Sequence, residues 1–279
     1  MSRFRKLVKR IIVATAGEDA AARVAQIYED ARSRIESSLT PTGRRSAAGL
    51  RTFRDRHHGQ RCFIIGNGPS LATMDLSPLR GEVTFGLNRV YLMFERLGFP
   101  TTYLVSVNRY VIEQCADDLA HLAIPTFLSW HSRRFVPDKS RAIFLRSVGR
   151  PHFATDPTVG LWEGATVTYV ALQLAYYMGF REVILIGVDH SFATKGPAHQ
   201  LVTSQGDDPN HFDPSYFGKG FRWQLPDLET SEIAYRMARH AFEADGRHVL
   251  DATVGGKLDI FEKAEFGSLF KPRPDGPLV

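Results

Sequence analysis

The sequence predicts an α/β fold in which a mainly parallel, Rossmann-like sheet is flanked by helices. Three observations predict it: short β-rich runs alternate with helical segments, most of these runs are continuously apolar, and a glycine follows several of the helices. Continuously apolar strands are typical of parallel sheets covered by helices on both faces. The alternation itself indicates repeated strand–helix–strand units. An N-terminal helical arm and one long functional loop complete the expected architecture.

The expected elements follow one another in a regular order. The β-rich runs cover residues 61–65, 82–85, 102–105, 125–128, 142–145, 182–186 and 248–250. The helical segments among them cover residues 90–97, 111–121, 165–178 and 229–244. Gly98, Gly179 and Gly246 follow three of these helices, at the place where a left-handed cap favours glycine. Residues 191–226, rich in Gly, Pro, Asp and His, are predicted to form the long loop at the active site.

Charge divides the 279-residue chain into a basic helical N-terminal arm, residues 1–58, and a Rossmann-like body, residues 59–279. The arm carries 13 Lys and Arg against 6 Asp and Glu, whereas the body carries 22 against 24. A nucleic-acid-binding domain needs a basic face on its folded body. We therefore expect no nucleic-acid partner.

The arm itself is predicted to contain two helices. Phe4, Leu7 and Ile11 fall at helical spacing among Arg and Lys residues, so residues 3–12 form a short basic amphipathic helix. Two interpretations stay open: contact with an anionic membrane surface, or attachment to the protein's own core or to a second subunit in a homo-oligomer. A second helix is expected over residues 18–37, followed by a turn or linker at residues 38–49.

Composition bears on where the protein is located and on its cysteine chemistry. There is no stretch of 18 apolar residues, and Lys9 and Arg10 interrupt the apolar stretch near the N-terminus. We therefore expect a cytoplasmic protein, with contact at the inner face of the membrane through residues 3–12 left open. The two cysteines, Cys62 and Cys115, make neither a disulfide framework nor a metal site.

Polar side chains follow four of the predicted strands. Asn67, Asn88, Asn108 and Asp189 each stand just past the end of an apolar run. Each alone has a simple explanation as a turn or helix-capping residue. In an open α/β sheet, however, the carboxyl edge of the strands is where ligands bind. Amide side chains carry both donors and an acceptor, so three amides and a carboxylate at one edge predict a site for a sugar or a base.

The loop after the first strand, "IIGNGPSL", predicts a phosphate contact. Gly66 and Gly68 let backbone N–H groups approach a ligand, and the hydroxyl of Ser70 stands near a helix N-terminus. The loop is not the dinucleotide fingerprint, because Leu71 stands where that motif has its third glycine. It is not a Walker loop either, since no Gly-Lys-Ser/Thr follows.

Together these segments resemble one superfamily. "IIGNGPSL", "GLNRVY", "SVNRY" and "GATVTYVALQLAYYMGFREVILIGVD" look like the bacterial lipooligosaccharide sialyltransferases and the 6-hydroxymethylpterin diphosphokinase (MptE-like) proteins, over roughly residues 60–255. The resemblance implies that Asn67, Asn88 and Asn108 hold the phosphate and cytidine-ribose part of a CMP-sugar. It also implies that Gly164, Ala165 and Thr166 lie beside the nucleotide. Asp189 would then lie at the base or ribose.

The same resemblance suggests the catalytic residues. His211 lies in the region that holds the catalytic histidine of the sialyltransferases, matched by region only. His190 and Phe192 stand where that family has paired tyrosines, so Tyr216 or Lys219 is expected to stabilise the leaving phosphate. We count His211, Tyr216 and Asp189 as the catalytic candidates. Nearby Asp207, Asp208 and Asp213 are interpreted as solvated turn residues.

Three functions remain open from the sequence. The leading one is a glycosyltransferase that moves a sugar from a CMP-sugar donor to a glycan or lipid-linked acceptor in cell-surface glycan synthesis, without a metal. The alternative is an MptE-like diphosphokinase that transfers pyrophosphate from ATP to a pterin-type alcohol and needs Mg²⁺. A third is a nucleotide-binding protein without turnover.

Overall fold

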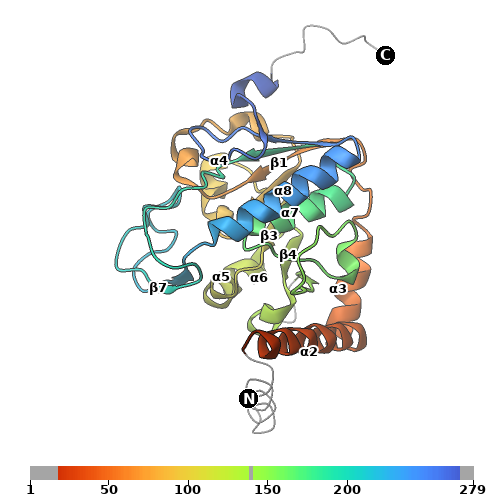
Figure 1. Cartoon of the computed structure of the whole chain (residues 1–279). Helices are drawn as coiled ribbons and strands as arrows, with labels where there is room; N and C mark the ends of the chain where they lie inside the picture. The colour runs from red at the N-terminus through yellow and green to blue at the C-terminus, as the bar shows by residue number, and fades with distance from the viewer. Residues whose placement is uncertain (1–17, 138–140, 271–279) are drawn as a thin grey trace.

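An eight-stranded parallel sheet forms the centre of the protein, for which a computed structural model describes residues 18–137 and 141–270 (Figure 1). In spatial order its strands are β10 (Glu262–Lys263), β9 (His248–Asp251), β6 (Glu182–Ile186), β1 (Arg61–Ile65), β2 (Thr84–Leu87), β3 (Tyr103–Ser106), β4 (Thr126–Ser129) and β5 (Ile143–Leu145). Every neighbouring pair in this sheet is parallel. The predicted Rossmann-like α/β class is confirmed.

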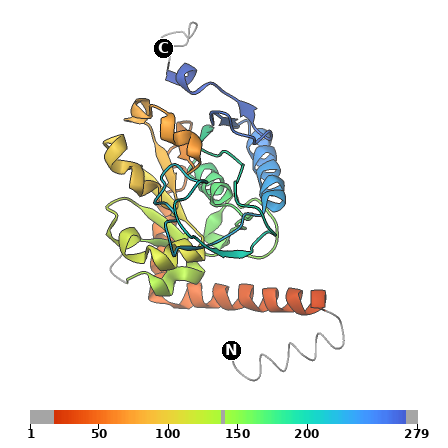
Figure 2. The same cartoon turned by 90° about the vertical axis from the view of Figure 1, so that its left-hand side faces the viewer.

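Helices cover both faces of the sheet and one end of it (Figures 1 and 2). They are α2 (Glu18–Leu39), α3 (Pro41–Arg51), α4 (Phe94–Leu97), α5 (Arg109–Gln114), α6 (Ala116–His121), α7 (Val167–Tyr177) and α8 (Leu228–Ala244). Short 3₁₀ turns add η1 (Pro69–Thr73), η2 (Ser77–Leu79), η3 (Val90–Met93), η4 (Trp130–Phe135), η5 (Pro157–Val159) and η6 (Phe266–Phe270). The predicted helix at 111–121 is two short helices, α5 and α6, and the one at 90–97 begins as a 3₁₀ turn.

The long loop contains a small hairpin that the sequence analysis did not predict. β7 (Leu201–Thr203) and β8 (Arg222–Gln224) pair antiparallel, outside the main sheet. Each has three residues and neither is continuously apolar, so the pattern that identified the buried strands could not identify them.

The predicted linker at residues 38–49 is wrong, because most of it is the helix α3. The Thr40 hydroxyl accepts a hydrogen bond from the backbone N–H of Gly43, and Pro41 occupies the first turn, where its missing N–H costs nothing. Leu50 is buried near the end of the helix. Turn-forming residues here start a helix instead of replacing one.

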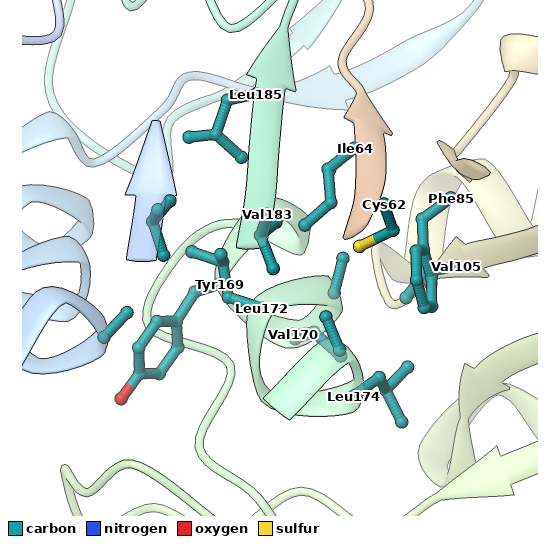
Figure 3. Close-up of a cluster of buried hydrophobic side chains, with 14 of the residues drawn as sticks. Cys62, Ile64, Phe85, Val105, Tyr169, Val170, Leu172, Leu174, Val183 and Leu185 are labelled. Atoms are coloured by element: carbon teal, nitrogen blue, oxygen red, sulfur yellow. The ribbon is translucent and has the colours of Figure 1, made fainter. Parts of the chain in front are cut away.

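Two apolar layers enclose the sheet, and alternating side chains of β1 supply both. Cys62 and Ile64 point to the layer that contains α7, while Phe63 and Ile65 belong to the other layer (Figure 3). Leu50 also lies in the α7 layer, so α3 is joined to the core of the sheet. The division of the chain at residue 58 stays a prediction, but α3 is not separate from the body in its contacts.

The amphipathic segment 3–12 lies outside the described residues. Within 18–137 and 141–270, no helix combines the length and the apolar character that crossing a bilayer requires.

Candidate functional site

A cleft opens at the carboxyl ends of β1 and β6, where the strand order reverses. From β1 the chain continues to β2, β3, β4 and β5 on one side, whereas β6, β9 and β10 lie on the other. In open α/β sheets a ligand binds at this switch point. We call this cavity of about 480 Å³ the strand-end cleft, and its lining includes residues that follow β1, β2, β3, β4 and β6.

Most of the predicted site residues line this cleft together. They are Gly66, Asn67, Gly68, Asn88, Asn108, Ala165, Thr166, Asp189 and His211. Three others, Ser70, Gly164 and Tyr216, are not part of the lining. Segments far apart in the sequence therefore meet at one place, as the strand-end pattern predicted.

Asn67, on the cleft lining, has a side-chain oxygen without a hydrogen-bond partner in the described part of the chain. Its side chain is nine-tenths buried, and Oδ1 has no hydrogen-bond partner among the described residues. The hydroxyl of Ser132, also on the lining, is buried and unpaired in the same sense. Buried polar atoms without partners are rare in native proteins, because each costs about 1–3 kcal/mol. Two of them on one lining indicate that the cleft is built for a polar ligand.

Asn88 and Asn108 are held so that their amide donors stay available. The Oδ1 atom of Asn88 accepts a hydrogen bond from the Ser106 hydroxyl at 3.0 Å. The Oδ1 atom of Asn108 caps α5 by accepting from the backbone N–H groups of Tyr110 and Val111. The capping explanation is thus correct for Asn108, but in both residues Nδ2 makes no hydrogen bond within the described part of the chain.

The glycine loop is closed by the protein itself, which corrects the expectation that its backbone binds phosphate. The N–H groups of Gly66 and Gly68 donate to the carbonyls of Ile186 and Gly187. The backbone N–H and hydroxyl of Ser70 both donate to the Asp189 carboxylate, at 3.1 and 2.8 Å. Asp189 is therefore already engaged, and burial raises its pKa, an effect that the hydrogen bonds from Ser70 oppose.

The N-terminus of α7 is the better place for an anion. Gly164 and Ala165 both have positive φ, at 58° and 56°, and turn the chain into the helix at the cleft. The backbone N–H groups of Ala165 and Val167 have no partner in the described structure, and the 11-residue helix aligns its dipole behind them. Gly164 is required for packing, because a Cβ there would lie 2.5 Å from Cβ of Ala234.

His211 is oriented by a buried carboxylate that the sequence analysis misjudged. Asp208 is 7% exposed, not solvated, and its Oδ2 lies 2.7 Å from Nδ1 of His211. The same oxygen accepts from the backbone N–H of Phe217. An ionised carboxylate can only accept, so Nδ1 carries the proton and Nε2 is the nitrogen left to meet a bound molecule.

Tyr216 supports His211 from below instead of facing the cleft. The two rings stack with centroids 3.9 Å apart, and Tyr216 has no exposed surface. Its hydroxyl accepts from the backbone N–H of Arg89, and the Arg89 guanidinium donates to the carbonyl of Tyr216. A direct contact between Tyr216 and a leaving phosphate is therefore not available in this arrangement.

The segment that carries His211 is also tied to the glycine loop. The backbone N–H of Phe212 donates to the carbonyl of Asn67 at 2.9 Å. This bond fixes the candidate base relative to the unpaired amide of the cleft.

Strained backbone gathers at the cleft. Five non-glycine residues of the described chain have positive φ, and four of them line the cleft: Asn88, Ala165, His190 and His199. Such conformations cost about 1–3 kcal/mol each and cluster at functional sites. Because these conformations cost stability, their placement at the cleft favours a functional role for its lining.

Glu163, on the cleft lining, was missed from the sequence. It stands just before Gly164, and no strand-end pattern marks it. Burial raises the pKa of its carboxyl, although hydrogen bonds from Ser147 and Ser129 oppose this. A carboxyl with a raised pKa in a cleft is a candidate proton donor or acceptor.

We expect Glu163→Gln to flatten the pH dependence of stability. Because the folded pKa of Glu163 lies above its ordinary value of 4.5, the native state holds this proton more tightly than the unfolded chain. Its contribution to stability is therefore present at low pH and is lost as pH rises through the folded pKa. Gln has no proton to lose and keeps the acceptor for Ser147.

Melting temperatures at about pH 5 and pH 8 measure this. The difference between the two melting temperatures should be smaller in Glu163→Gln than in the parent, because the variant should melt at a higher temperature than the parent at pH 8. The exposed Glu262→Gln serves as the control. An equal loss of melting temperature at both pH values would contradict the prediction.

The described residues contain no group of three or more His, Cys, Asp or Glu side chains arranged to hold a metal ion. Two histidines of the cleft lining lie beside carboxylates: His190 pairs with Glu232 and His199 with Asp227, each at 3.2 Å.

Comparison with known proteins gives the family. The sequence matches the family model described as 6-hydroxymethylpterin diphosphokinase MptE-like over residues 44–195, more than half of the chain. The protein belongs to the MptE-like family, which confirms that resemblance and indicates a transferase-type function. No curated protein matches the sequence.

One solved structure among those that match is the MAf glycosyltransferase from Magnetospirillum magneticum AMB-1. It shares 13% sequence identity with this chain at a TM-score of 0.48, and the match covers 80% of this chain and 38% of that one. This chain thus matches well under half the length of that structure.

Proposed function

We propose that this MptE-like protein is a glycosyltransferase that binds a CMP-sugar in the strand-end cleft and transfers its sugar to an acceptor hydroxyl. The observation that carries the proposal is the buried, unpaired Oδ1 of Asn67, a residue of the cleft lining, which also includes Asn88 and Asn108 with their available amide donors. An acceptor and several donors in one row suit the hydroxyls of a ribose and the edge of a base. The sugar's destination, a glycan or a lipid-linked acceptor, belongs to the same proposal.

The N-terminus of α7 supports a phosphate at the neighbouring position. The free N–H groups of Ala165 and Val167 and the helix dipole favour a negative charge there. A CMP-sugar leaves as a monophosphate, so charge that develops in the transition state is met by donors that are already in place. No metal is required for this step.

His211 supplies the base. Its Nε2 accepts the proton of the acceptor hydroxyl, the oxygen bonds to the anomeric carbon, and the bond from that carbon to the phosphate oxygen breaks to release CMP. Asp208 keeps Nδ1 protonated and stabilises the imidazolium that forms. Tyr216 contributes by stacking on the ring and holding its plane.

A second candidate function is favoured by the family description and by the carboxylates of the cleft. In a diphosphokinase, ATP would occupy the same edge, and Glu163 with Asp189 would face Mg²⁺ bound to its phosphates. Asp189 already accepts two hydrogen bonds from Ser70, which leaves it fewer lone pairs for a metal. The glycosyl-transfer function therefore fits the cleft better.

A ligand-dependent thermal-shift series separates these functions. CMP, CDP, UDP, GDP and ATP are each added with and without Mg²⁺, since a ligand that binds only the native state raises its melting temperature. Stabilisation by CMP without metal is expected. Stabilisation by ATP only in the presence of Mg²⁺ would favour the diphosphokinase, and no shift with any nucleotide would contradict both. Binding of CMP without release of CMP from a CMP-sugar would favour the third function, a nucleotide-binding protein without turnover.

Asn88→Asp tests whether the amide donors of the cleft bind the nucleotide. Asp keeps the acceptor for Ser106 and tolerates the positive φ of 48°, but it replaces the Nδ2 donor with a charged oxygen. CMP affinity measured by calorimetry should fall roughly tenfold or more, with little change in the melting temperature of the free protein. Alanine is a poorer choice here, because it would strain the backbone and leave Ser106 unpaired. A large loss of stability in Asn88→Asp would show that the residue is structural.

A further inference from the structure

A second cavity adjoins the strand-end cleft. Helix α2, which lies across the lower end of the molecule in Figure 2, contributes to its lining. It has a volume of about 620 Å³ and is lined by residues of α2, α3, α5 and η4. Arg109 and His131 line both this cavity and the cleft, so the two spaces share a wall. We call it the arginine recess, after its five arginines: Arg32, Arg45, Arg109, Arg133 and Arg134.

The recess carries more positive charge than its own acids neutralise. Glu29 and Glu36 are its only carboxylates within the described lining, so five arginines against two glutamates leave three positive charges. Burial and the nearby Arg133 lower the pKa of His131 below its ordinary value.

The arginines differ in how they are held. Glu36 pairs with both Arg32 and Arg133, at 2.8 and 2.7 Å. Arg45 makes no hydrogen bond or ion pair within the described residues, and Arg134 contacts only the ring of Phe135. Two guanidinium groups are thus left to bind something else, while Glu36 holds Arg32 and Arg133 in place beside them.

Trp130 adds an independent sign of a missing partner. It lines the recess, is 1% exposed, and its indole Nε1–H has no hydrogen-bond partner in the described structure. The guanidinium of Arg133 lies 4.1 Å from the centre of its ring, which fixes the indole in place. Buried donors without a partner are rare in native proteins, so this one, on a residue of the recess lining, is a second observation that favours a polar ligand there.

We propose that the arginine recess binds a phosphate group carried by the acceptor substrate, an inference that rests on the transferase function proposed for the adjoining cleft. A monophosphate or diphosphate brings two or three negative charges, which match the excess of the recess, whereas a carboxylate brings one. Arginine forks bind phosphate oxygens through paired hydrogen bonds, and Trp130 adds a donor. Because Arg109 and His131 border both spaces, an acceptor anchored by its phosphate in the recess can extend its hydroxyl end into the cleft.

Calorimetry with inorganic pyrophosphate on the full chain tests the recess directly. The parent should bind pyrophosphate, and Arg45→Ala/Arg134→Ala should bind it about tenfold or more weakly, because two charge-assisted contacts are removed. The matched control is Arg51→Ala/Arg150→Ala, which removes the same charge from exposed arginines outside the recess and should bind like the parent. CMP affinity should be equal in all three proteins.

The outcomes separate this inference from the proposed function. An equal loss of pyrophosphate affinity in Arg51→Ala/Arg150→Ala would mean that binding reflects general electrostatic attraction. That result would overturn the recess as a site. Displacement of pyrophosphate by CMP would place it in the cleft and would also overturn the inference. Glucose 1-phosphate should bind and glucuronate should bind more weakly; the reverse order would overturn the phosphate assignment. Failure of CMP to bind, with pyrophosphate binding intact, would count against the proposed donor alone.

Discussion

Replacing His211 with Asn is expected to lower the rate of CMP release from a CMP-sugar by about 10²–10⁴-fold, the usual contribution of a positioned general base. Asn keeps a donor for Asp208 in place of Nδ1 and removes Nε2, so the geometry of the loop is preserved while the base is lost. The affinity for CMP should stay near that of the parent, because the base contacts the acceptor and not the nucleotide.

Asp208→Asn should reduce kcat in the same assay by acting through His211. The amide can donate to Nδ1 and so favour the tautomer whose Nε2 is protonated and cannot accept a proton. KM for the donor should change little. Asp207→Asn is the control, since Asp207 is the exposed neighbour of Asp208 and makes no contact with His211. If His211→Asn and Asp208→Asn both turned over at the parent's rate while CMP still bound, another group would have to be the base.

Gly68→Ala is expected to lower the stability of the fold. A Cβ at this position would lie 1.7 Å from Oδ2 of Asp189, whose carboxylate is held by Ser70 and cannot move away freely. Overpacking of this kind costs about 1–3 kcal/mol in the free energy of unfolding. Chemical denaturation measures it, and Gly206→Ala is the matched control, because nothing lies within 4 Å of its added Cβ.

A double-mutant cycle identifies the cause of that loss. Asp189→Ala removes the carboxylate that the new methyl group meets, so the cost of Gly68→Ala should be smaller in the Asp189→Ala background than in the parent. Additive losses would show that the Asp189 carboxylate is not the obstacle, and would leave the carbonyl oxygen of Gly187, 2.9 Å from the added Cβ, as the group it meets.

The sequence predicted the sheet well because buried parallel strands leave a strong local signal. Residues 61–65 and 182–186 were predicted with the bounds that β1 and β6 have, since each is a run of apolar residues covered on both faces. The strand-end pattern also predicted that Asn67, Asn88 and Asn108 would share one edge. Both inferences need only that the strands run parallel, which the alternation of strands and helices indicates.

The parts that could not be predicted depend on contacts across the chain. Asp208 has the local sequence of a turn, and only the fold reveals that it is buried beside His211. Ser70 was expected to meet a phosphate, yet Asp189, 119 residues later, occupies its donors. Single-sequence patterns report the face of an element but not the partner that a distant segment brings to it.

The hydrogen bond from the Phe212 backbone to the carbonyl of Asn67 joins the proposed nucleotide-binding edge to the segment that carries His211, the proposed base. Any change in the chain that reshapes the first strand's loop to accept a different donor would also displace His211. Divergence of donor preference within this scaffold therefore carries a penalty in turnover, unless a compensating change in residues 208–217 accompanies it.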